Sequence, residues 1–535
     1  MSYSYHNFSC DNMEFQGRVL LLTGRMAFDD LVGITSEFDN VEVEALPISV
    51  AAFTTPRLVS RHISKFVETH KPDVILVSGL ANGDYSKLSE EIGVILKKGT
   101  RYLSAVPVLL RNLHDVLPLL SGKKPADDII RAKIIEELRT QINRIEDGSV
   151  FGMRNLRLRS GLSVGMDLPP RVMAEVVDAT SRPFESCVLE AGYYSEWADI
   201  LDVGCTVSKP DPERVSETVT ELRKFKLPVS IDTLDPDEIL AAVDAGAEIV
   251  LSLDRGNFDV AQRIPEDVAL VCLPTNVASG IFPRVPSERA SICVETCNEL
   301  RRKGHENLLA DPLMEAPINP GLMDSLIAYH HCRKLDPDLP FLAGVGNVTE
   351  FVDSDTVGVN SILACLGIEL GISVFLSTEE RPSTYGCIKE LKSAAMMGFA
   401  SSISKAPPKE IGITSFSAKS SFFEVQSVSD DESYELVTDE KQDYDLDPSG
   451  SFRIGIDYRT RMILCEHKGR DGSVHRLKSK SASAILQTIH TRGYVSFLNH
   501  AAYLGSELTR AELSLKVGHN YNQDGPWDSE LTLDL

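Results

Sequence analysis

The stretch PVSIDTLDPDEILAAVDAGAEIV, residues 228–250, decides the fold class of this chain. A short apolar run ends at Asp232, an amphipathic segment of helical length follows, and a second apolar run begins at Ile249. Asp235 is suited to cap the amino end of the intervening helix. The pattern predicts a strand, a crossover helix and a second strand parallel to the first.

The same unit recurs along residues 170–400, where eight apolar runs alternate with amphipathic segments. Several of these segments begin with an Asp or Ser that can cap a helix. An open doubly wound sheet also alternates in this way, but eight consecutive units favour closure into a (β/α)₈ barrel, placed at 165–410. The runs are RVMAEVVDA, DILDVGC, LPVSIDT, EIVLSLD, VALVCLP, NLLADPL, PFLAGVGN and ISVFLST.

Three further regions flank the predicted barrel. Residues 1–150 read as a three-layer α/β domain of Rossmann or flavodoxin type that ends in a connecting helix at 127–147. Residues 411–450 are acidic and rich in serine, and are interpreted as a linker or exposed arm. Residues 451–535 suggest a small α+β module that begins with a β-hairpin.

Composition narrows the class of protein. A formal net charge of −24 disfavours a protein that lives on nucleic acid or an anionic membrane surface. The chain starts without an apolar signal segment, and its ten cysteines lack paired spacing, so we expect free thiols and a cytoplasmic location. The cysteines form no CxxC pair, and no clustered DxD motif or suitable histidine pair supports a metal at the strand ends, so no metal site is predicted.

Polar residues gather at the carboxyl ends of the predicted strands, where barrel enzymes carry their chemistry. Helix capping explains some of them. Asp202, Asp232 and Asp311 instead lie inside or at the end of apolar runs, where a buried carboxylate needs a partner with N–H donors. Bases are scarce there, so an uncharged heterocycle rich in N–H donors fits better than a metal ion. The complete set is Asp178, Asp202, Asp232, Asp254, Thr275 with Asn276, Asp311, Asn347, and Thr378 with Glu379; the bases are Lys209 and Arg255.

Residues 198–250, together with NLLADPL (307–313), resemble the pterin-binding barrels, the family of dihydropteroate synthases and methyltetrahydrofolate methyltransferases. The resemblance covers about 170–400, and the whole architecture looks like the archaeal proteins called dihydropteroate synthase-related. It implies that Asp232 and Asp311 hold the 2-amino-pyrimidinone edge of a pterin, with Asp202 on the same floor. Further candidate contacts are Asp178, Ser252, Asp254 and Lys209.

The segment GVGNVTE (344–350) distinguishes the two branches of this family. With GVNSILACLGIELGISVFL (358–376) it resembles the methyltransferase branch, in which an Asn after strand seven reaches N5 of the pterin; Asn347 takes that place. The bases that a synthase carries after strands seven and eight are absent, and only VSKP (207–210) offers a Lys in a comparable position.

The resemblance therefore implies methyl transfer from an N5-methyl-tetrahydropterin, either tetrahydromethanopterin or tetrahydrofolate. Asn347 and Asp232 are the expected catalytic residues, and a corrinoid protein is a candidate acceptor. Two alternatives stay open. One is synthase-type condensation of a pterin-methyl diphosphate with an arylamine, which requires Mg²⁺, and the other is non-catalytic pterin binding. No nucleic-acid or membrane partner is expected, and a homodimer is a candidate assembly.

Overall fold

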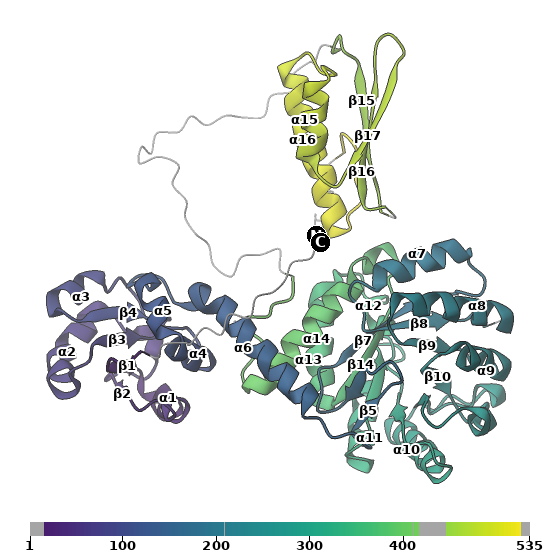
Figure 1. Ribbon diagram of the computed structural model, residues 1–535, viewed down its shortest axis with the longest axis horizontal. Helices are drawn as coiled ribbons and strands as arrows, with labels where there is room; N and C mark the ends of the chain where they lie inside the picture. Colours follow the sequence, from purple (N-terminus) through teal and green to yellow (C-terminus); the bar gives the residue numbers. More distant parts are fainter. Residues whose placement is uncertain (1–14, 208, 410, 417–445, 459, 526–535) are drawn as a thin grey trace. The chain divides into compact units, whose positions relative to one another are not determined.

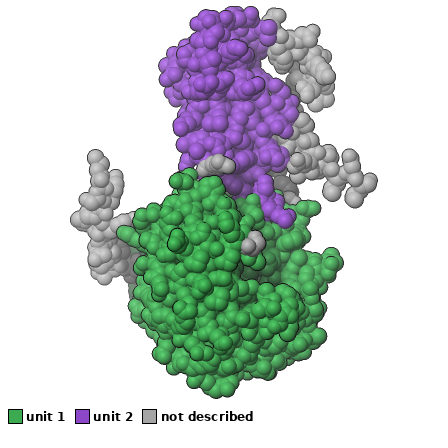
Figure 2. All heavy atoms as spheres, turned by 90° about the vertical axis from the view of Figure 1, so that its right-hand side faces the viewer, with its two compact units in different colours: residues 1–380, 387–417 green, residues 381–386, 418–535 purple. Residues whose placement is uncertain are grey.

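The computed structural model describes residues 15–207, 209–409, 411–416, 446–458 and 460–525. The chain divides into two compact units, one made of residues 1–380 and 387–417 and the other of residues 381–386 and 418–535 (Figure 2). Most of the predicted linker at 411–450 lies outside the described residues.

The amino-terminal part contains a four-stranded parallel sheet of order β2-β1-β3-β4. β1 and β3 are buried along their whole length, which explains their unbroken apolar sequences. Its assignment to the Rossmann or flavodoxin type stays a prediction. The strands are β1 (Val19–Thr23), β2 (Val41–Ala45), β3 (Val74–Val77) and β4 (Ile95–Lys98); the helices are α1 (Phe28–Thr35), α2 (Pro56–His70), α3 (Ser86–Ile92), α4 (Val106–Arg111) and α5 (Leu113–Val116).

The helix expected at 127–147 is α6 (Asp127–Asp147). Its buried side chains, Ile130, Ile134, Leu138 and Ile142, recur every fourth residue, so one stripe of the helix packs inward.

Eight parallel strands close into a barrel in the order β10-β11-β12-β13-β14-β7-β8-β9 (Figure 1). The predicted barrel is confirmed, and each of the eight apolar runs forms one of its strands. They are β7 (Arg171–Val176), β8 (Ile200–Gly204), β9 (Val229–Asp232), β10 (Ile249–Leu253), β11 (Ala269–Cys272), β12 (Leu308–Ala310), β13 (Phe341–Gly344) and β14 (Ile372–Ser377).

Helices pack around the strands. Asp235 accepts hydrogen bonds from the backbone N–H groups of Asp237 and Glu238, both at 3.0 Å, and so caps its helix as expected. The link between β10 and β11 departs from the predicted repeat, since it carries a 3₁₀ helix, η6 (Phe258–Arg263), in place of an α-helix. The α-helices are α7 (Phe184–Tyr194), α8 (Pro212–Leu222), α9 (Pro236–Ala245), α10 (Pro286–Arg302), α11 (Leu322–Leu335), α12 (Gly346–Thr349), α13 (Thr356–Leu370) and α14 (Cys387–Ser404).

A β-hairpin fills the amino-terminal end of the barrel. It consists of β5 (Asn155–Arg157) and β6 (Ser163–Gly165), and its Leu156 and Val164 pack against inward-facing barrel residues such as Met173. The barrel side chains that the hairpin packs against in this cluster are apolar.

The carboxyl-terminal unit contains an antiparallel sheet of order β15-β16-β17. The strands are β15 (Ser451–Asp457), β16 (Met462–Lys468) and β17 (Val474–Ser479), and the helices α15 (Ala482–Thr491) and α16 (Leu498–Val517) pack on the sheet through a small apolar core. None of the helices described here, in either unit, is long and apolar enough to cross a membrane. The nine cysteines among the described residues are free thiols.

Replacing Leu156 by Ala tests the role of the hairpin. The side chain is 1% exposed, so its truncation should cost about 2 to 5 kcal/mol of stability. The midpoint of thermal unfolding of the full chain, followed by circular dichroism, should fall. Leu189→Ala is the matched control, because Leu189 is 76% exposed and its loss should change stability by less than about 0.5 kcal/mol. Equal midpoints for both variants would contradict the packing of the hairpin.

Candidate functional site

A cavity of about 300 Å³ opens at the carboxyl ends of the barrel strands. It has an acidic lining, and none of the residues that line it is Lys, Arg or His. The lining comprises Glu175, Val177, Asp232, Leu251, Ser252, Val271, Leu273, Asp311, Leu313, Leu342, Gly344, Gly346, Asn347, Glu350, Leu376, Ser377, Thr378 and Glu380. This is the end of the barrel at which the sequence predicts chemistry.

Glu175 and Asp202 face each other from neighbouring strands. They are direct partners in the pairing of β7 with β8, and each lies two residues beyond an inward-facing apolar residue, Met173 or Ile200. Because side chains alternate along a strand, both carboxylates point into the barrel. Gly204 leaves room for Glu175, since a methyl group at position 204 would clash with Oε1 of Glu175.

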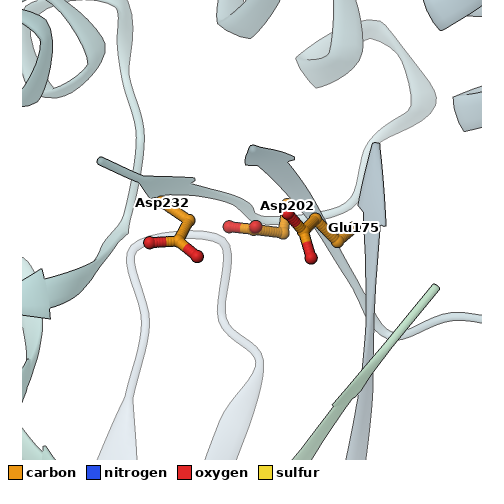
Figure 3. A group of neighbouring side chains, drawn as sticks. All are labelled: Glu175, Asp202 and Asp232. Atoms are coloured by element: carbon orange, nitrogen blue, oxygen red, sulfur yellow. The ribbon is translucent and has the colours of Figure 1, made fainter. Parts of the chain in front are cut away.

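Asp232 completes a group of three carboxylates. One oxygen from each of Glu175, Asp202 and Asp232 lies within 4.8 Å of the others, and Figure 3 shows Asp202 between its two neighbours. The Ser230 hydroxyl donates to Oδ1 of Asp202 at 2.5 Å, and the Ser252 hydroxyl donates to Oδ1 of Asp232. Asp202 is fully buried, and its Oδ2 has no hydrogen-bond partner among the described residues.

Ser252 reaches Asp232 through an unusual backbone conformation. Its φ is +37°, and the pairing of β10 with β11 shifts register between Val250 and Leu253. Such irregularities turn a side chain out of the regular alternation and are common beside functional sites. The bulge therefore aims the hydroxyl at Asp232.

Burial raises the pKa of each of these three acids above its usual range. For Glu175, desolvation is the main cause and the neighbouring charges of Asp202 and Asp232 add to it. Desolvation likewise leads for Asp202, followed by the charge of Asp232, and for Asp232, where the Ser252 hydroxyl opposes the increase in pKa. With no base in the lining, the group has to take up protons or bind a positively charged or N–H-rich ligand.

Asp311 faces the cavity from the end of β12. Its Oδ1 lies 2.7 Å from the hydroxyl of the buried Tyr329 and accepts from the N–H of Leu313 at 2.8 Å. Burial raises the pKa of Asp311 to about 6, although both hydrogen bonds lower it. The buried Arg289 fixes the following loop by donating to the Pro312 carbonyl at 2.6 Å.

Asn347 stands on the rim after β13. Its Nδ2 donates to the Met314 carbonyl at 3.0 Å, which leaves Oδ1 of the amide as an acceptor. Gly344 and Gly346 also line the cavity, and because they have no side chains they leave space beside Asn347. The hydrogen bond from Nδ2 thus holds the amide in place, while Oδ1 can accept a hydrogen bond from a ligand.

The structure brings five of the eight predicted site residues together. Four of them, Asp232, Ser252, Asp311 and Asn347, line the cavity, and Asp202 lies beneath it among the three carboxylates. Their roles in binding or catalysis stay predictions.

The other three predicted residues do not line the cavity. Asp178 accepts from the Thr206 hydroxyl at 2.9 Å. Asp254 accepts from the N–H of Val277 at 2.7 Å and the Thr275 hydroxyl at 3.0 Å, so it joins two loops. Lys209 is exposed.

Sequence reasoning missed Glu175, Glu350 and Glu380 in the cavity wall. The last polar residue of the first run is Asp178, which lies beyond the end of β7. The alternation that begins at Met173 was the available signal for Glu175, since it places every second residue inside the barrel. No local signal separates Glu350 or Glu380 from other acids in loops.

The chain has a relative over nearly its full length. It is 32% identical over 526 residues to the uncharacterized protein MJ0107 of Methanocaldococcus jannaschii, with 95% of this chain and 98% of that protein covered. The chain belongs to the same family as MJ0107. Within it, residues 446–524 match the family model PterinBD-DUF4346, and residues 17–101 match a family of unknown function, DUF6513. The sequence-based recognition of a dihydropteroate synthase-related protein is thereby confirmed at the level of the family.

Solved structures also resemble the chain. One is the dihydropteroate synthase of Xanthomonas albilineans in complex with 7,8-dihydropteroate, at 22% identity and a TM-score of 0.36, covering 46% of this chain and 98% of that chain. Another is the Burkholderia cenocepacia dihydropteroate synthase complexed with 7,8-dihydropteroate, at 18% identity and a TM-score of 0.36, covering 48% and 99%.

Asp311→Asn should change the pH dependence of stability. The pKa of Asp311 is about 6 in the folded chain against an ordinary value of 3.8, so the folded state holds the proton more tightly. The favourable contribution of Asp311 to the free energy of unfolding is fully present below pH 3.8, and it is lost as the pH rises through about 6. Relative to the parent, the variant should gain about 2 to 3 kcal/mol in free energy of unfolding between pH 4 and pH 7.

Urea unfolding at pH 4, 5, 6 and 7 measures this difference. Asn keeps an oxygen for Tyr329 and Leu313, so the hydrogen bonds to Oδ1 are retained. A difference in free energy that does not vary with pH would contradict the burial of an ionisable Asp311.

Proposed function

We propose that the barrel cavity binds a reduced pterin and that the protein transfers a methyl group from N5 of that pterin to a nucleophilic acceptor. The observation that carries this proposal is the lining of the cavity, which combines buried carboxylates and one oriented amide with no basic side chain. The match of residues 446–524 to a family model named for pterin binding supports the ligand class.

The buried carboxylates suit the amino-pyrimidinone edge of a pterin. That edge presents adjacent N–H groups, and a carboxylate accepts such a pair as it accepts the fork of a guanidinium. Asp232 and Asp311 both line the cavity, and each already accepts from a hydroxyl on Oδ1. These hydroxyls orient the two carboxyl groups, so a ligand with N–H donors meets prearranged acceptors.

The absence of bases favours methyl transfer over condensation with a diphosphate substrate. A pterin-methyl diphosphate brings several negative charges, and the Arg or Lys side chains that pair with such charges are missing from the cavity lining. Arg255 is engaged by Glu299 at 2.7 Å, and neither Arg255 nor Lys209 lines the cavity. A methylated tetrahydropterin has no diphosphate beside its ring, so the acidic wall does not oppose the binding of the ring.

Asn347 is the proposed catalytic residue. In the transfer, the N5–CH₃ bond breaks, its electron pair stays on N5, and an electron pair of the acceptor forms the new bond to carbon. N5 must be protonated or strongly hydrogen-bonded for its amine to leave. The Oδ1 of Asn347 can accept from N5–H⁺ as the charge develops, while Nδ2 stays on the Met314 carbonyl. A reduced corrinoid protein is one candidate for the acceptor.

Asp232→Asn and Asp311→Asn should each weaken the binding of methyl-tetrahydromethanopterin by about tenfold or more, because an amide replaces an acceptor oxygen with a second donor. Isothermal titration of the purified full chain measures the affinity. Asp244→Asn is the matched control, since Asp244 is exposed on the outer helix α9, and its affinity should equal that of the parent. Normal binding by both cavity variants would rule out this pterin site.

A parallel titration uses a pterin-methyl diphosphate with Mg²⁺. The methyl-transfer proposal expects weak or no binding of this ligand by the parent. Tight binding of the diphosphate alone would overturn methyl transfer and favour the condensation reaction.

Asn347→Ala separates catalysis from binding. Loss of one oriented acceptor for the developing charge should lower the rate of methyl transfer by about 10- to 100-fold. The dissociation constant of the methylated pterin should stay within about threefold of the parent value, because the amide acts mainly in the transition state. Single-turnover transfer to a reduced corrinoid measures the rate, and a rate equal to that of the parent would exclude the role of Asn347.

A further inference from the structure

Glu175, Asp202 and Asp232 provide more carboxylates than the recognition of a pterin requires. The three carboxylates come from the neighbouring strands β7, β8 and β9 and converge at the floor of the cavity (Figure 3). Glu175 and Asp202 lie side by side in the strand pairing, where like charges repel. Such an arrangement is stabilised when protons, N–H donors or a bound cation offset the repulsion.

Among the residues that the structure describes, each of these carboxylates keeps an oxygen that accepts no hydrogen bond. The hydroxyls of Ser230 and Ser252 engage Oδ1 of Asp202 and Asp232. The Oδ2 of Asp202 is buried without any partner among the described residues, although a buried acceptor of this kind costs free energy when left unmatched. Figure 3 shows this carboxyl group lying between the other two carboxyl groups.

We infer that Glu175, Asp202 and Asp232 bind one divalent cation, Mg²⁺ or Mn²⁺, at the floor of the barrel cavity. Their oxygens lie within 4.8 Å of one another, so small side-chain rotations bring all three to one ion at about 2.0 to 2.2 Å. Two positive charges then offset most of the three negative ones. The cation also supplies the partner that Oδ2 of Asp202 lacks.

The chemistry of the ligands selects the class of cation. The group contains carboxylate oxygens alone, which suit hard ions such as Mg²⁺ and Mn²⁺ rather than Cu²⁺ or a structural Zn²⁺. Glu175 and Asp232 also line the cavity, so water from the cavity can complete an octahedral shell around the ion.

The cation site goes beyond the proposed pterin site and does not depend on it. The two sites share Asp232, whose carboxylate has enough lone pairs to accept from a ligand and bind a metal ion. A titration with metal alone therefore tests the cation, whereas failure to bind a pterin leaves that result unaffected.

Electron paramagnetic resonance of Mn²⁺ added to the full chain, after chelator treatment and dialysis, measures binding through loss of the signal of free Mn²⁺. We expect one Mn²⁺ per chain with a dissociation constant below about 1 mM, displaced by excess Mg²⁺. Glu175→Gln should weaken binding by at least about tenfold. No hydrogen bond to Glu175 is present among the described residues, so this substitution removes no internal contact of that kind.

Two further variants sharpen the result. Asp202→Asn keeps an oxygen for Ser230 and should lose affinity as Glu175→Gln does, which provides a second measurement if one variant folds poorly by circular dichroism. Glu380→Gln is the matched control, because Glu380 lines the same cavity but lies outside the three-carboxylate group; its affinity should stay within about twofold of the parent.

Three results overturn the inference. The first is a parent chain that binds no Mn²⁺, which means that protons alone neutralise the group. The second is a folded Glu175→Gln or Asp202→Asn variant with the affinity of the parent. The third is an equal loss in Glu380→Gln, which shows general attraction by the acidic cavity rather than a site.

Discussion

The constraint on which the rest of the structure depends is the concentration of buried carboxylates at one end of a closed parallel barrel. Eight parallel strands carry their inward-facing side chains to the same rim, so acids far apart in the sequence become neighbours. Asp202 is fully buried there and Asp232 is half-buried, without a basic side chain in the cavity lining. Each therefore needs hydroxyl or N–H donors, a proton, or a ligand.

Several features of the barrel serve this requirement. Ser230 and Ser252 donate to the two carboxylates, and Tyr329 contacts Asp311. Gly204 vacates the space that Glu175 fills. The hydroxyl donors orient the carboxyl groups without neutralising them, so these carboxyl groups can still accept hydrogen bonds from a ligand. A fold selected only for stability would pair these groups or replace them with apolar residues, whereas unmatched polar groups in a cavity are typical of ligand sites.

The structure separates residues that line the cavity from residues that support loops. Asp254 resembles Asp232 in the sequence, since both lie at or beside the end of an apolar run, but Asp254 is engaged by loop donors from Thr275 and Val277. Arg289 also supports a loop, since it donates to the Pro312 carbonyl after β12. This scaffold holds Asp311 and Asn347 in place, and the two proposed ligands, a pterin and a cation, then share the side of the cavity formed by Asp232.

The sequence by itself determined the barrel, because apolar runs and amphipathic segments are local patterns whose period follows from strand and helix geometry. It also determined Asp202, Asp232 and Asp311 as candidate site residues, since a carboxylate inside an apolar run conflicts with burial. Only the tertiary structure decided which acids meet. Glu175 joins Asp202 through strand pairing, and Ser252 reaches Asp232 through a bulge, both of which depend on register between segments distant in the chain. Capping and ligand binding use the same residue types at strand ends, so Asp178 and Asp254 could be separated from the site only by their three-dimensional partners.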